Sequence, residues 1–480
     1  MTTFVSNGGD HPFGDGQSGN LPEDLDTILS NALFKLSVGE RNSIDEEFHG
    51  VSTLAPKESP ELLKSKLLEL SDELDLISDD CPLKAAYIES QQYHETYTNT
   101  DDFRLRFLRC ELFDAKKAAT RLIKFLSFAS DIFGPELLRR PIRFSDLTKE
   151  EVKIFRSGDI QMLPYRDQAG RPVAVWVGGF DIAPHVKTRV RLMLYLFYSL
   201  TNDIENQQKG LIKLVWIQSE SAVGAPSFAD VRGFQRLYDS SPIRDTSNHF
   251  CLPDKPAFHL FRAMVGMSHA GNFFRLKFHI GEETELRYKL KNYGLPIQLL
   301  PLTGTGNIKT NYHKQWVRLR KTLDEKSAKG EDDDSIIEWP RSTDVVFRTG
   351  MSLAYHPGNT MFQSIVLSKT KEHAVASQTR KREITKDIIN KVRQNKGRFV
   401  QWDTRGWWTE LDDASKIHAK VAIAVRDSRK KIAAKYNRQS CHASTSLFQH
   451  QDGKRRKIAH DDGFSSDSSS SKDNKCLILK

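Results

Sequence analysis

The chain has few cysteines, and they do not form the short patterns that bind metals or exchange disulfides. Its five cysteines are an odd number spread over 480 residues, with no Cys-x-x-Cys pair: Cys81, Cys110, Cys251, Cys441 and Cys476. This spacing argues against a disulfide framework and against a structural zinc site, and it suits a reducing compartment. We therefore expect a cytoplasmic protein.

The sequence also lacks hydrophobic segments that would target it to a membrane or span one. Residues 1–9 have neither the basic stretch nor the apolar stretch of a secretory signal. The longest apolar run, residues 192–200, is far shorter than the roughly 20 residues that a spanning helix needs. Thr2 excludes N-myristoylation, and Lys480 follows the prenylation-like segment Cys476-Leu-Ile-Leu. The expectation is a soluble protein without a transmembrane segment.

Motifs for catalysis and for cofactor binding are missing as well. The sequence contains no Gly-x-Ser-x-Gly elbow, no His-Glu-x-x-His motif, no P-loop and no dinucleotide fingerprint. Its 15 histidines are scattered, so that no metal centre is indicated. We expect no enzymatic activity, no catalytic residue, no bound metal and no cofactor.

Charge is present in normal amount but is distributed unevenly. Residues 1–100 contain 6 Lys and Arg against 19 Asp and Glu, whereas residues 341–440 contain 21 against 9. A basic excess of this size favours an anionic partner for the second half of the chain. An ordinary solvated surface is the alternative interpretation.

The first two thirds of the chain are predicted to fold as α/β. Apolar residues recur at helical spacing within residues 59–155, where Asp114 is a suitable N-cap for a helix that follows a bend. Residues 156–318 then alternate short apolar strands with helices, and residues 167–170 fit a type I turn. This alternation predicts a mixed, mostly parallel sheet covered by helices that form an apolar pocket.

The remaining segments differ from this pattern in composition. Residues 319–338 are predicted to be a charged linker, and residues 339–440 a second, small, mainly helical and basic domain. The acidic residues 1–58 and the Ser- and Asp-rich residues 441–480 are predicted to be disordered, because they bury too little apolar surface to offset the entropy of ordering.

Several motifs occur in the order found in one family of lipid-binding proteins. Arg106-Phe-Leu-Arg109 precedes Leu112-Phe-Asp114, and the hairpin Tyr165-Arg-Asp-Gln-Ala-Gly-Arg-Pro172 follows. Over residues 95–315 the chain resembles the CRAL-TRIO family of lipid-binding and lipid-transfer proteins. The resemblance implies an α/β pocket with a gate helix over residues 256–267, and non-enzymatic binding and transfer of a small hydrophobic lipid.

The chain departs from that family where the lipid head group is concerned. Phosphatidylinositol-binding members carry a basic pair where this chain has Glu111-Leu112, so specificity for that lipid is not carried over. Ile217-Gln-Ser-Glu220 also replaces the usual Asp and Gly after the central strand. Arg275 and Lys277 lie near the family's other basic position and are the candidates for contact with a head group.

A lipid carrier needs an apolar cavity, because an acyl chain that leaves a bilayer for water costs about 0.8 kcal/mol per CH₂ group. Each candidate for the pocket or its gate could instead fill an ordinary core. The candidates are aromatic, aliphatic or methionine side chains, namely Trp176, Tyr195, Phe197, Trp216, Phe258, Phe261, Met264, Val265 and Met267.

The second domain resembles the opening of an uncharacterised domain family. It begins Asp344-Val-Val-Phe-Arg-Thr-Gly350 and continues His356-Pro-Gly-Asn359, which we interpret as a turn with Asn359 capping the next helix. Aromatic and basic residues alternate further on, a pattern that fits nucleic acid or an anionic membrane, with a packed Trp core as the alternative. This predicted anionic-partner surface comprises Arg398, Trp402, Arg405, Trp407, Trp408, Lys416 and Lys420.

A short basic cluster near the end of the chain resembles a nuclear-import signal. It consists of Lys454, Arg455, Arg456 and Lys457. Together with the basic domain it supports an alternative function, in which a nuclear DNA- or RNA-binding regulatory protein acts through residues 339–440. Lipid binding remains the first hypothesis.

Overall fold

The computed structural model divides the chain into two compact units. The first unit comprises Met1–Ser364 and Ile389–Ile417, and the second comprises Ile365–Ile388 and His418–Lys480. The residues that the structure describes are 36–178, 185–217, 228–256, 258, 261–262, 265–266, 274–331, 335–348 and 356–452, with backbone only for 228–231 and 435–452.

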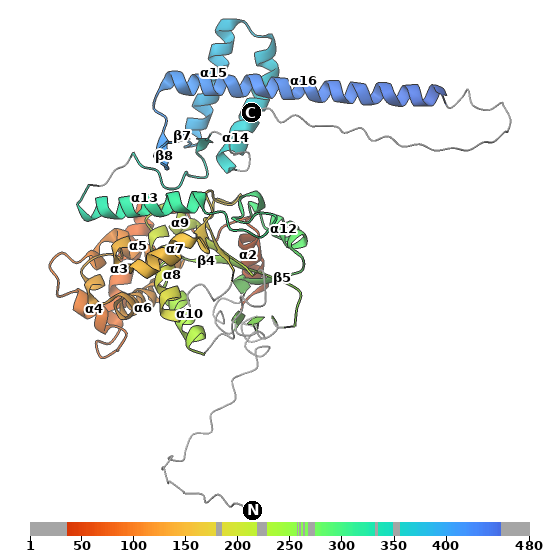
Figure 1. Ribbon diagram of the computed structural model, residues 1–480. Helices are drawn as coiled ribbons and strands as arrows, with labels where there is room; N and C mark the ends of the chain where they lie inside the picture. Colours follow the sequence, from red (N-terminus) through yellow and green to blue (C-terminus); the bar gives the residue numbers. More distant parts are fainter. Residues whose placement is uncertain are drawn as a thin grey trace, which may run out of the picture. The chain divides into compact units, whose positions relative to one another are not determined.

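The first unit opens with a group of helices, as the sequence predicts for residues 59–155 (Figure 1). The side chain of Asp114 accepts a hydrogen bond from the Lys117 amide at 3.0 Å, which confirms it as the N-cap of α6. The helices are α2 (Val38–Phe48), α3 (Pro60–Leu76), α4 (Ala85–Ser90), α5 (Asp101–Cys110), α6 (Ala115–Phe133) and α7 (Lys149–Ser157).

A five-stranded sheet follows, and it confirms the predicted α/β class. Its strands lie in the order β1-β2-β3-β4-β5, and β1 is antiparallel to β2 while the other neighbours are parallel. The strands are β1 (Ile160–Met162), β2 (Val173–Val177), β3 (Leu211–Trp216), β4 (Asp245–Leu252) and β5 (Leu276–Ile280).

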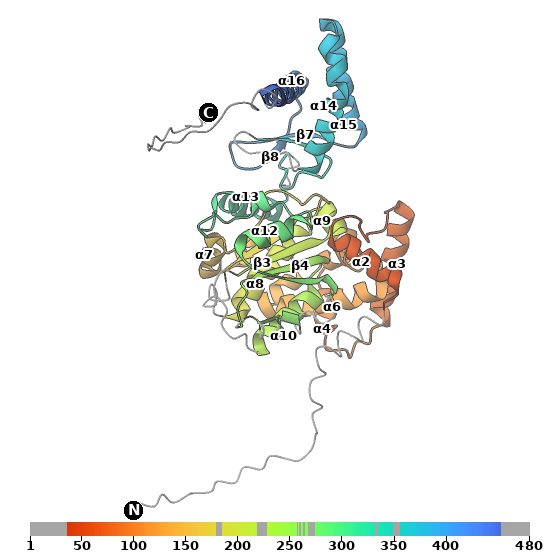
Figure 2. The same cartoon turned by 90° about the vertical axis from the view of Figure 1, so that its right-hand side faces the viewer.

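Helices cover both faces of this sheet (Figure 2). On one face, α8 (Val186–Leu200) and α10 (Phe228–Ser240) join the first helices in one hydrophobic cluster with Ala174 of β2. On the other face, Leu286 and Leu290 of α12 (Glu283–Lys291) pack against alternate residues of β2 and β3. A short helix, α9 (Ile204–Lys209), lies between α8 and β3 in the sequence.

The segment predicted to be a charged linker, residues 319–338, is instead tied into the first unit. Helix α13 (Asn311–Ala328) buries Trp316 and Arg320, and Asp324 of the same helix pairs with Arg320. The Arg320 guanidinium lies 2.8 Å from the carboxylate of Glu338, which also accepts a hydrogen bond from the Trp316 indole at 2.8 Å. The many charged residues of this segment suggested a linker, but polar contacts such as those of Arg320 and Trp316 with Glu338 hold its described residues in the first unit.

The predicted disorder of residues 1–58 also needs correction where the structure describes that segment. Residues 38–48 form α2, which begins with a capping box between Ser37 and Glu40. The buried Arg244 and the partly buried Arg275 bind the carboxylate of Glu47 at the other end of this helix. At the opposite end of the chain, helix α16 continues to Asp452, so residues 441–452 are helical rather than disordered.

The predicted basic domain is mainly helical, and it also contains a three-stranded sheet. In this sheet β6 (Val345–Phe347) is parallel to β7 (Phe399–Trp402), and β7 is antiparallel to β8 (Trp408–Glu410). Its helices are α14 (Pro357–Val375), α15 (Gln378–Gln394) and α16 (Ala414–Asp452). Within the second unit, the Thr370 hydroxyl of α14 lies 3.3 Å from the Ser428 hydroxyl of α16.

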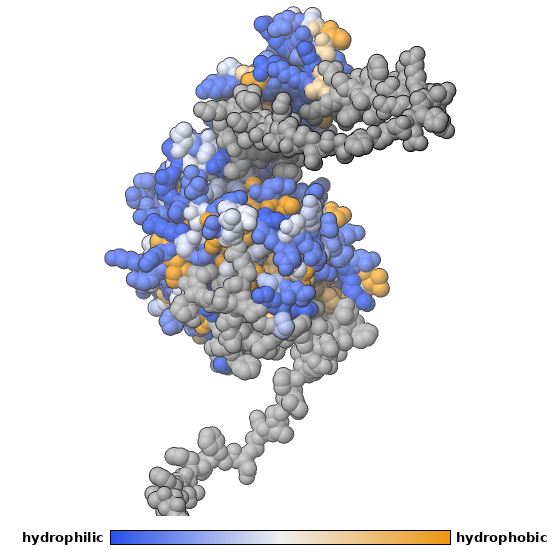
Figure 3. All heavy atoms as spheres, turned by 45° about the vertical axis from the view of Figure 1, so that its right-hand side comes forward, coloured by the Kyte–Doolittle hydropathy of each residue, from blue (hydrophilic) through white to orange (hydrophobic). Residues whose placement is uncertain are grey.

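On the face shown in Figure 3, hydrophilic residues dominate the described surface and hydrophobic residues occur in small groups. Large apolar residues that are exposed, such as Val51, Tyr288 and Val375, are far apart in the sequence. Among the described helices, none combines the length and the apolar character that crossing a bilayer requires. Scattered exposed apolar residues are normal for a folded domain and do not form an interface.

Four buried histidines predict that acid destabilises the protein. Burial lowers the pKa of His279, His313 and His356 to about 4, and it lowers the pKa of His249 well below its usual value. The unfolded chain therefore binds protons near pH 6.5 that the folded chain does not bind. The free energy of unfolding should fall from pH 6.5 to pH 4, by up to about 1.4 kcal/mol per pH unit for each histidine.

Urea denaturation of the full chain at several pH values between 4 and 7.5 measures this effect. The variant His94→Gln is the control, because the side chain of His94 is exposed. The free energy of unfolding of this variant should depend on pH in the same way as that of the wild type. A free energy of unfolding that stays constant over this range would contradict the burial of the four histidines.

Candidate functional site

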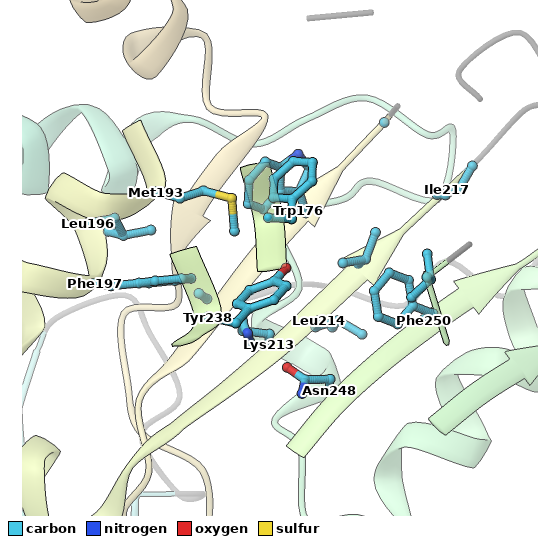
Figure 4. A pocket seen from close by; sticks show the side chains of 15 residues that line it. Trp176, Met193, Leu196, Phe197, Lys213, Leu214, Ile217, Tyr238, Asn248 and Phe250 are labelled. Carbon is cyan, nitrogen blue, oxygen red and sulfur yellow. The ribbon is translucent and has the colours of Figure 1, made fainter. Parts of the chain in front are cut away.

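An apolar pocket lies between the five-stranded sheet and the helices α8 and α10 (Figure 4). Its cavity volume is about 70 Å³, and the pocket is open on one side. Pockets that bind small molecules typically have volumes of about 300–1,000 Å³ and mostly apolar walls. The pocket has the apolar walls of such sites but a smaller volume, so a lipid chain fits only if the pocket widens or the chain extends through its open side.

The periodicity of two elements brings their side chains into this pocket. Helix α8 contributes Met193, Leu196 and Phe197, which lie on one helical face because they are spaced by three and four residues. Strand β2 contributes Ala174 and Trp176, because alternate residues of a strand point to the same side. Figure 4 shows these side chains, other than Ala174, converging on one space.

One side of the pocket is polar. The ammonium group of Lys213 on β3 lies 2.6 Å from a carboxylate oxygen of Asp245 and 3.7 Å from the ring centre of Tyr238. Burial lowers the pKa of Lys213, and the Asp245 carboxylate opposes this effect. Among the described residues that line the pocket, Lys213 alone is charged, and Asp245 balances its charge.

Asn248 lies beside Lys213 because the two residues are register partners on the parallel strands β4 and β3. The Asn248 side chain lines the pocket, and the residue is only 1% exposed. Neither atom of its carboxamide has a hydrogen-bond partner within the described part of the chain. Sequence reasoning missed Asn248, because an asparagine inside a strand has no distinctive pattern.

Several of the predicted lining and gate residues lie at this pocket or next to it. Trp176, Phe197 and Val265 line the pocket directly. Phe258 and Phe261 are buried in an adjoining cluster with Val265, and the residues described between 258 and 266 are helical, as predicted for the gate. Met264 and Met267 lie outside the described residues.

Two of the predicted lining residues point elsewhere. In the parallel pair of β2 and β3, Trp176 is opposite Val215 and Trp216 is opposite Val177, so the two tryptophans point to opposite faces of the sheet. Trp216 packs in the cluster with α12. The hydroxyl of Tyr195 donates a hydrogen bond to Asp324 at 3.0 Å, away from the pocket.

The two candidates for contact with a head group are also displaced from the pocket. Arg275 is partly buried and binds Glu47 at 2.7 Å and the Thr246 carbonyl at 3.1 Å. Lys277 pairs in register with His249, the neighbour of Asn248, and therefore lies on the face of the sheet away from the pocket. Sequence alone did not fix this register, and a shift of one residue reverses the face.

In the second predicted domain, the motif residues Asp344 and Asn359 make polar contacts that connect separate elements of the chain. The carboxylate of Asp344 is fully buried and binds the Arg398 guanidinium at 2.8 Å. The side chain of Asn359 accepts a hydrogen bond from the Val346 amide at 2.8 Å and donates one to its carbonyl at 3.0 Å. Asn359 therefore anchors α14 to β6 and lies within α14, instead of capping it as predicted.

Gly358 is expected to tolerate no side chain. A Cβ atom added there would lie 2.0 Å from the carbonyl oxygen of Asp344, which is a backbone atom. The variant Gly358→Ala should lower the free energy of unfolding by about 1–3 kcal/mol, as overpacking usually does. Chemical denaturation measures this, with Gly304→Ala as control because a Cβ there meets no atom within 4 Å. Equal stability of the two variants would contradict the close packing of Gly358.

Most residues of the predicted anionic-partner surface have internal contacts. Trp408 is buried, and Trp402 packs on it at 5.1 Å between ring centres. Arg398 pairs with Asp344, as described above. Arg405 lies 2.8 Å from Asp403 and 4.7 Å from the ring centre of Trp407. This geometry agrees with the alternative of a packed Trp core.

The rest of this predicted surface lies on α16. Lys416 is exposed, 3.6 Å from Asp413, and Lys420 is partly buried. Residues 454–457, the nuclear-import candidate, lie outside the described residues.

Comparison with known protein families finds a match for part of the chain. Residues 344–427 match the family described as Domain of unknown function (DUF6824). The matched segment begins at the buried Asp344 and includes the His356–Asn359 motif that anchors α14 to β6. No curated protein matches the chain.

Proposed function

We propose that the protein binds a small hydrophobic lipid in the pocket between β2–β4, α8 and α10, without catalysing a reaction, and transfers it between membranes. The observation that carries this proposal is the apolar pocket in the segment that resembles CRAL-TRIO proteins. A lipid chain of sixteen carbons loses about 0.8 kcal/mol per CH₂ group when it enters water. The walls contributed by α8 and β2 would replace those contacts with apolar side chains.

The arrangement of apolar residues supports an internal site over a surface site. Met193, Leu196 and Trp176 line one space between the sheet and α8, whereas the exposed apolar residues in Figure 3 are in small groups. Met193 also suits a pocket for an irregular guest, because methionine side chains are flexible and polarizable. The helical residues near Val265 border the pocket and fit the role of a gate.

Lipid that co-purifies with the protein tests this function. The full chain is purified without detergent and analysed by native mass spectrometry, and the bound material is extracted and identified. We expect about one lipid molecule per chain, and transfer of that lipid between vesicles. A protein that carries no lipid after expression and takes up none from vesicles would overturn the proposal.

A second proposal concerns an anionic partner, either nucleic acid or membrane, for the basic part of the chain. Its support is the exposed cationic segment of α16, where Arg426, Arg429, Lys430 and Lys431 are exposed. For binding through these charges, the logarithm of the association constant should fall linearly with the logarithm of the salt concentration. Binding of the full chain to duplex DNA, single-stranded RNA and anionic vesicles is measured across a salt series. Binding that is absent, or insensitive to salt, would remove this proposal.

A further inference from the structure

The polar side of the pocket contains a hydrogen-bonding group that the fold does not use. Asn248 lines the pocket and is 1% exposed, and its carboxamide oxygen and nitrogen both lack partners among the described residues. Buried polar groups in proteins are nearly always paired, because an unpaired one costs free energy. The position of Asn248 against open space, instead of packed protein, indicates that a ligand completes its hydrogen bonds.

The charges next to Asn248 restrict what that ligand can be. Lys213 is the register partner of Asn248, and Asp245 already neutralises it at 2.6 Å. Figure 4 groups Lys213, Tyr238 and Asn248 on the same side of the pocket. An anionic head group placed here would be a buried charge without a free cation among the described lining residues, which is strongly unfavourable. A cationic head group would likewise lack a counter-charge, because the Asp245 carboxylate already pairs with Lys213 and no described lining residue is acidic. The head group is therefore uncharged.

Asn248 offers both a donor and an acceptor to such a head group. Its nitrogen donates hydrogen bonds and its oxygen accepts them. We infer that the ligand is a lipid whose uncharged head group, a hydroxyl or an amide, both donates to and accepts from Asn248 while its hydrocarbon part fills the apolar pocket. This inference rests on the proposed function.

Four probes that share a sixteen-carbon chain test the inference: hexadecan-1-ol, hexadecanamide, hexadecane and hexadecyl phosphate. Each is offered in neutral phosphatidylcholine vesicles to the full-length wild type and to Asn248→Leu, and the bound probe is quantified after separation. For each probe the ratio of wild type to variant is compared, because this ratio cancels differences in how the probes partition into vesicles.

We expect the variant to bind the alcohol or the amide about tenfold less than the wild type, and hexadecane equally well. The alcohol and amide arms show which of the two head groups is used. If all four probes bind and every ratio is near one, the inference is overturned while the proposed function stands. If hexadecyl phosphate shows a larger ratio of wild type to variant than the alcohol and the amide, the inference is overturned but the proposed function stands. If no probe binds the wild type, the proposed function fails.

Stability of the variant separates a binding role from a structural one. Leucine has nearly the shape of asparagine and removes an unsatisfied buried amide, so Asn248→Leu should unfold at the same temperature as the wild type or higher. A variant that does not fold overturns the binding role, because it shows that the fold itself uses Asn248.

Discussion

The variant Glu47→Ala is expected to lower the free energy of unfolding of the first unit by about 3–5 kcal/mol, because it leaves the buried Arg244 and the partly buried Arg275 without their counter-charge. Glu47 is 0% exposed. Its carboxylate lies 2.6 Å from Arg244 and 2.7 Å from Arg275, and it accepts a hydrogen bond from the Leu54 amide at 2.8 Å. The two arginines directly precede β4 and β5, so Glu47 joins α2 to the start of both strands, and the Leu54 amide ties it to the segment that follows α2.

This effect should depend on pH with a defined sign. Burial alone would raise the pKa of Glu47, but Arg244 and Arg275 outweigh it and hold the pKa below its usual value of 4.5. The ionised carboxylate thus stabilises the fold fully above about pH 4.5, and this contribution is lost as the pH falls through the lowered pKa. The stability difference between wild type and variant should narrow below that pH.

Chemical denaturation of Glu47→Ala at pH 7 and at lower pH measures both effects. Glu46→Ala is a matched control, because Glu46 is the adjacent residue on α2 and its side chain is exposed. We expect the control to change the free energy of unfolding by less than about 0.5 kcal/mol. Equal stability of the two variants at pH 7 would mean that α2 is not anchored through Glu47.

The variant Ala174→Phe is expected to reduce lipid binding by at least about tenfold while the protein stays folded. Ala174 lies on β2 and lines the pocket. A phenyl ring at this position would occupy space that the hydrocarbon part of a ligand needs, and hydrophobic binding scales with the apolar area that can be buried. The cavity volume is about 70 Å³, so the ring also displaces neighbouring side chains, and we expect the variant to lose about 1–3 kcal/mol of unfolding free energy but to remain folded.

Lipid bound per chain, measured after extraction from purified protein, checks this prediction. The control is Val175→Ile, because Val175 is the next residue on β2 and packs on the opposite face of the sheet. We expect the control to keep the lipid content of the wild type. If Ala174→Phe is folded and carries as much lipid as Val175→Ile, the lipid is bound somewhere other than this pocket.

Features that depend on neighbours in the sequence were predictable here. The N-cap at Asp114 follows from a short polar side chain that can accept a hydrogen bond from the helix start. The turn from Asp167 to Gly170 closes with the predicted hydrogen bond, from the Gly170 amide to the Asp167 carbonyl, at 3.1 Å. Alternation of strands and helices over residues 156–318 predicted the α/β sheet, because each element buries one face by its own periodicity.

Features that depend on distant residues were not predictable in the same way. Whether Trp176 or Trp216 faces the pocket is decided by the register of β2 and β3, and both looked equally suitable from the sequence. Glu47 looked like part of an acidic, disordered segment, because its partners Arg244 and Arg275 are about two hundred residues away. One buried ion-pair cluster is enough to order a segment whose composition suggests disorder.

The tryptophans of the second predicted domain show another limit of sequence reasoning. Trp402 and Trp408 lie among basic residues in the sequence, which favours nucleic-acid binding by composition. In the structure they contact each other, and the Arg348 guanidinium lies 3.9 Å from the ring centre of Trp402. The sequence shows which residue types lie near one another along the chain, but not which of their side chains are buried in the core and so are not accessible to a partner.

Photochemical crosslinking tests most directly whether the pocket holds the lipid. The full chain is loaded with a sixteen-carbon alcohol that carries a diazirine at the middle of its chain, then irradiated, digested and analysed by mass spectrometry. We predict modified residues on β2 and on α8, around Trp176 and residues 193–197, and their loss in Ala174→Phe. Modification confined to other segments, or equal in wild type and Ala174→Phe, would contradict lipid binding in this pocket.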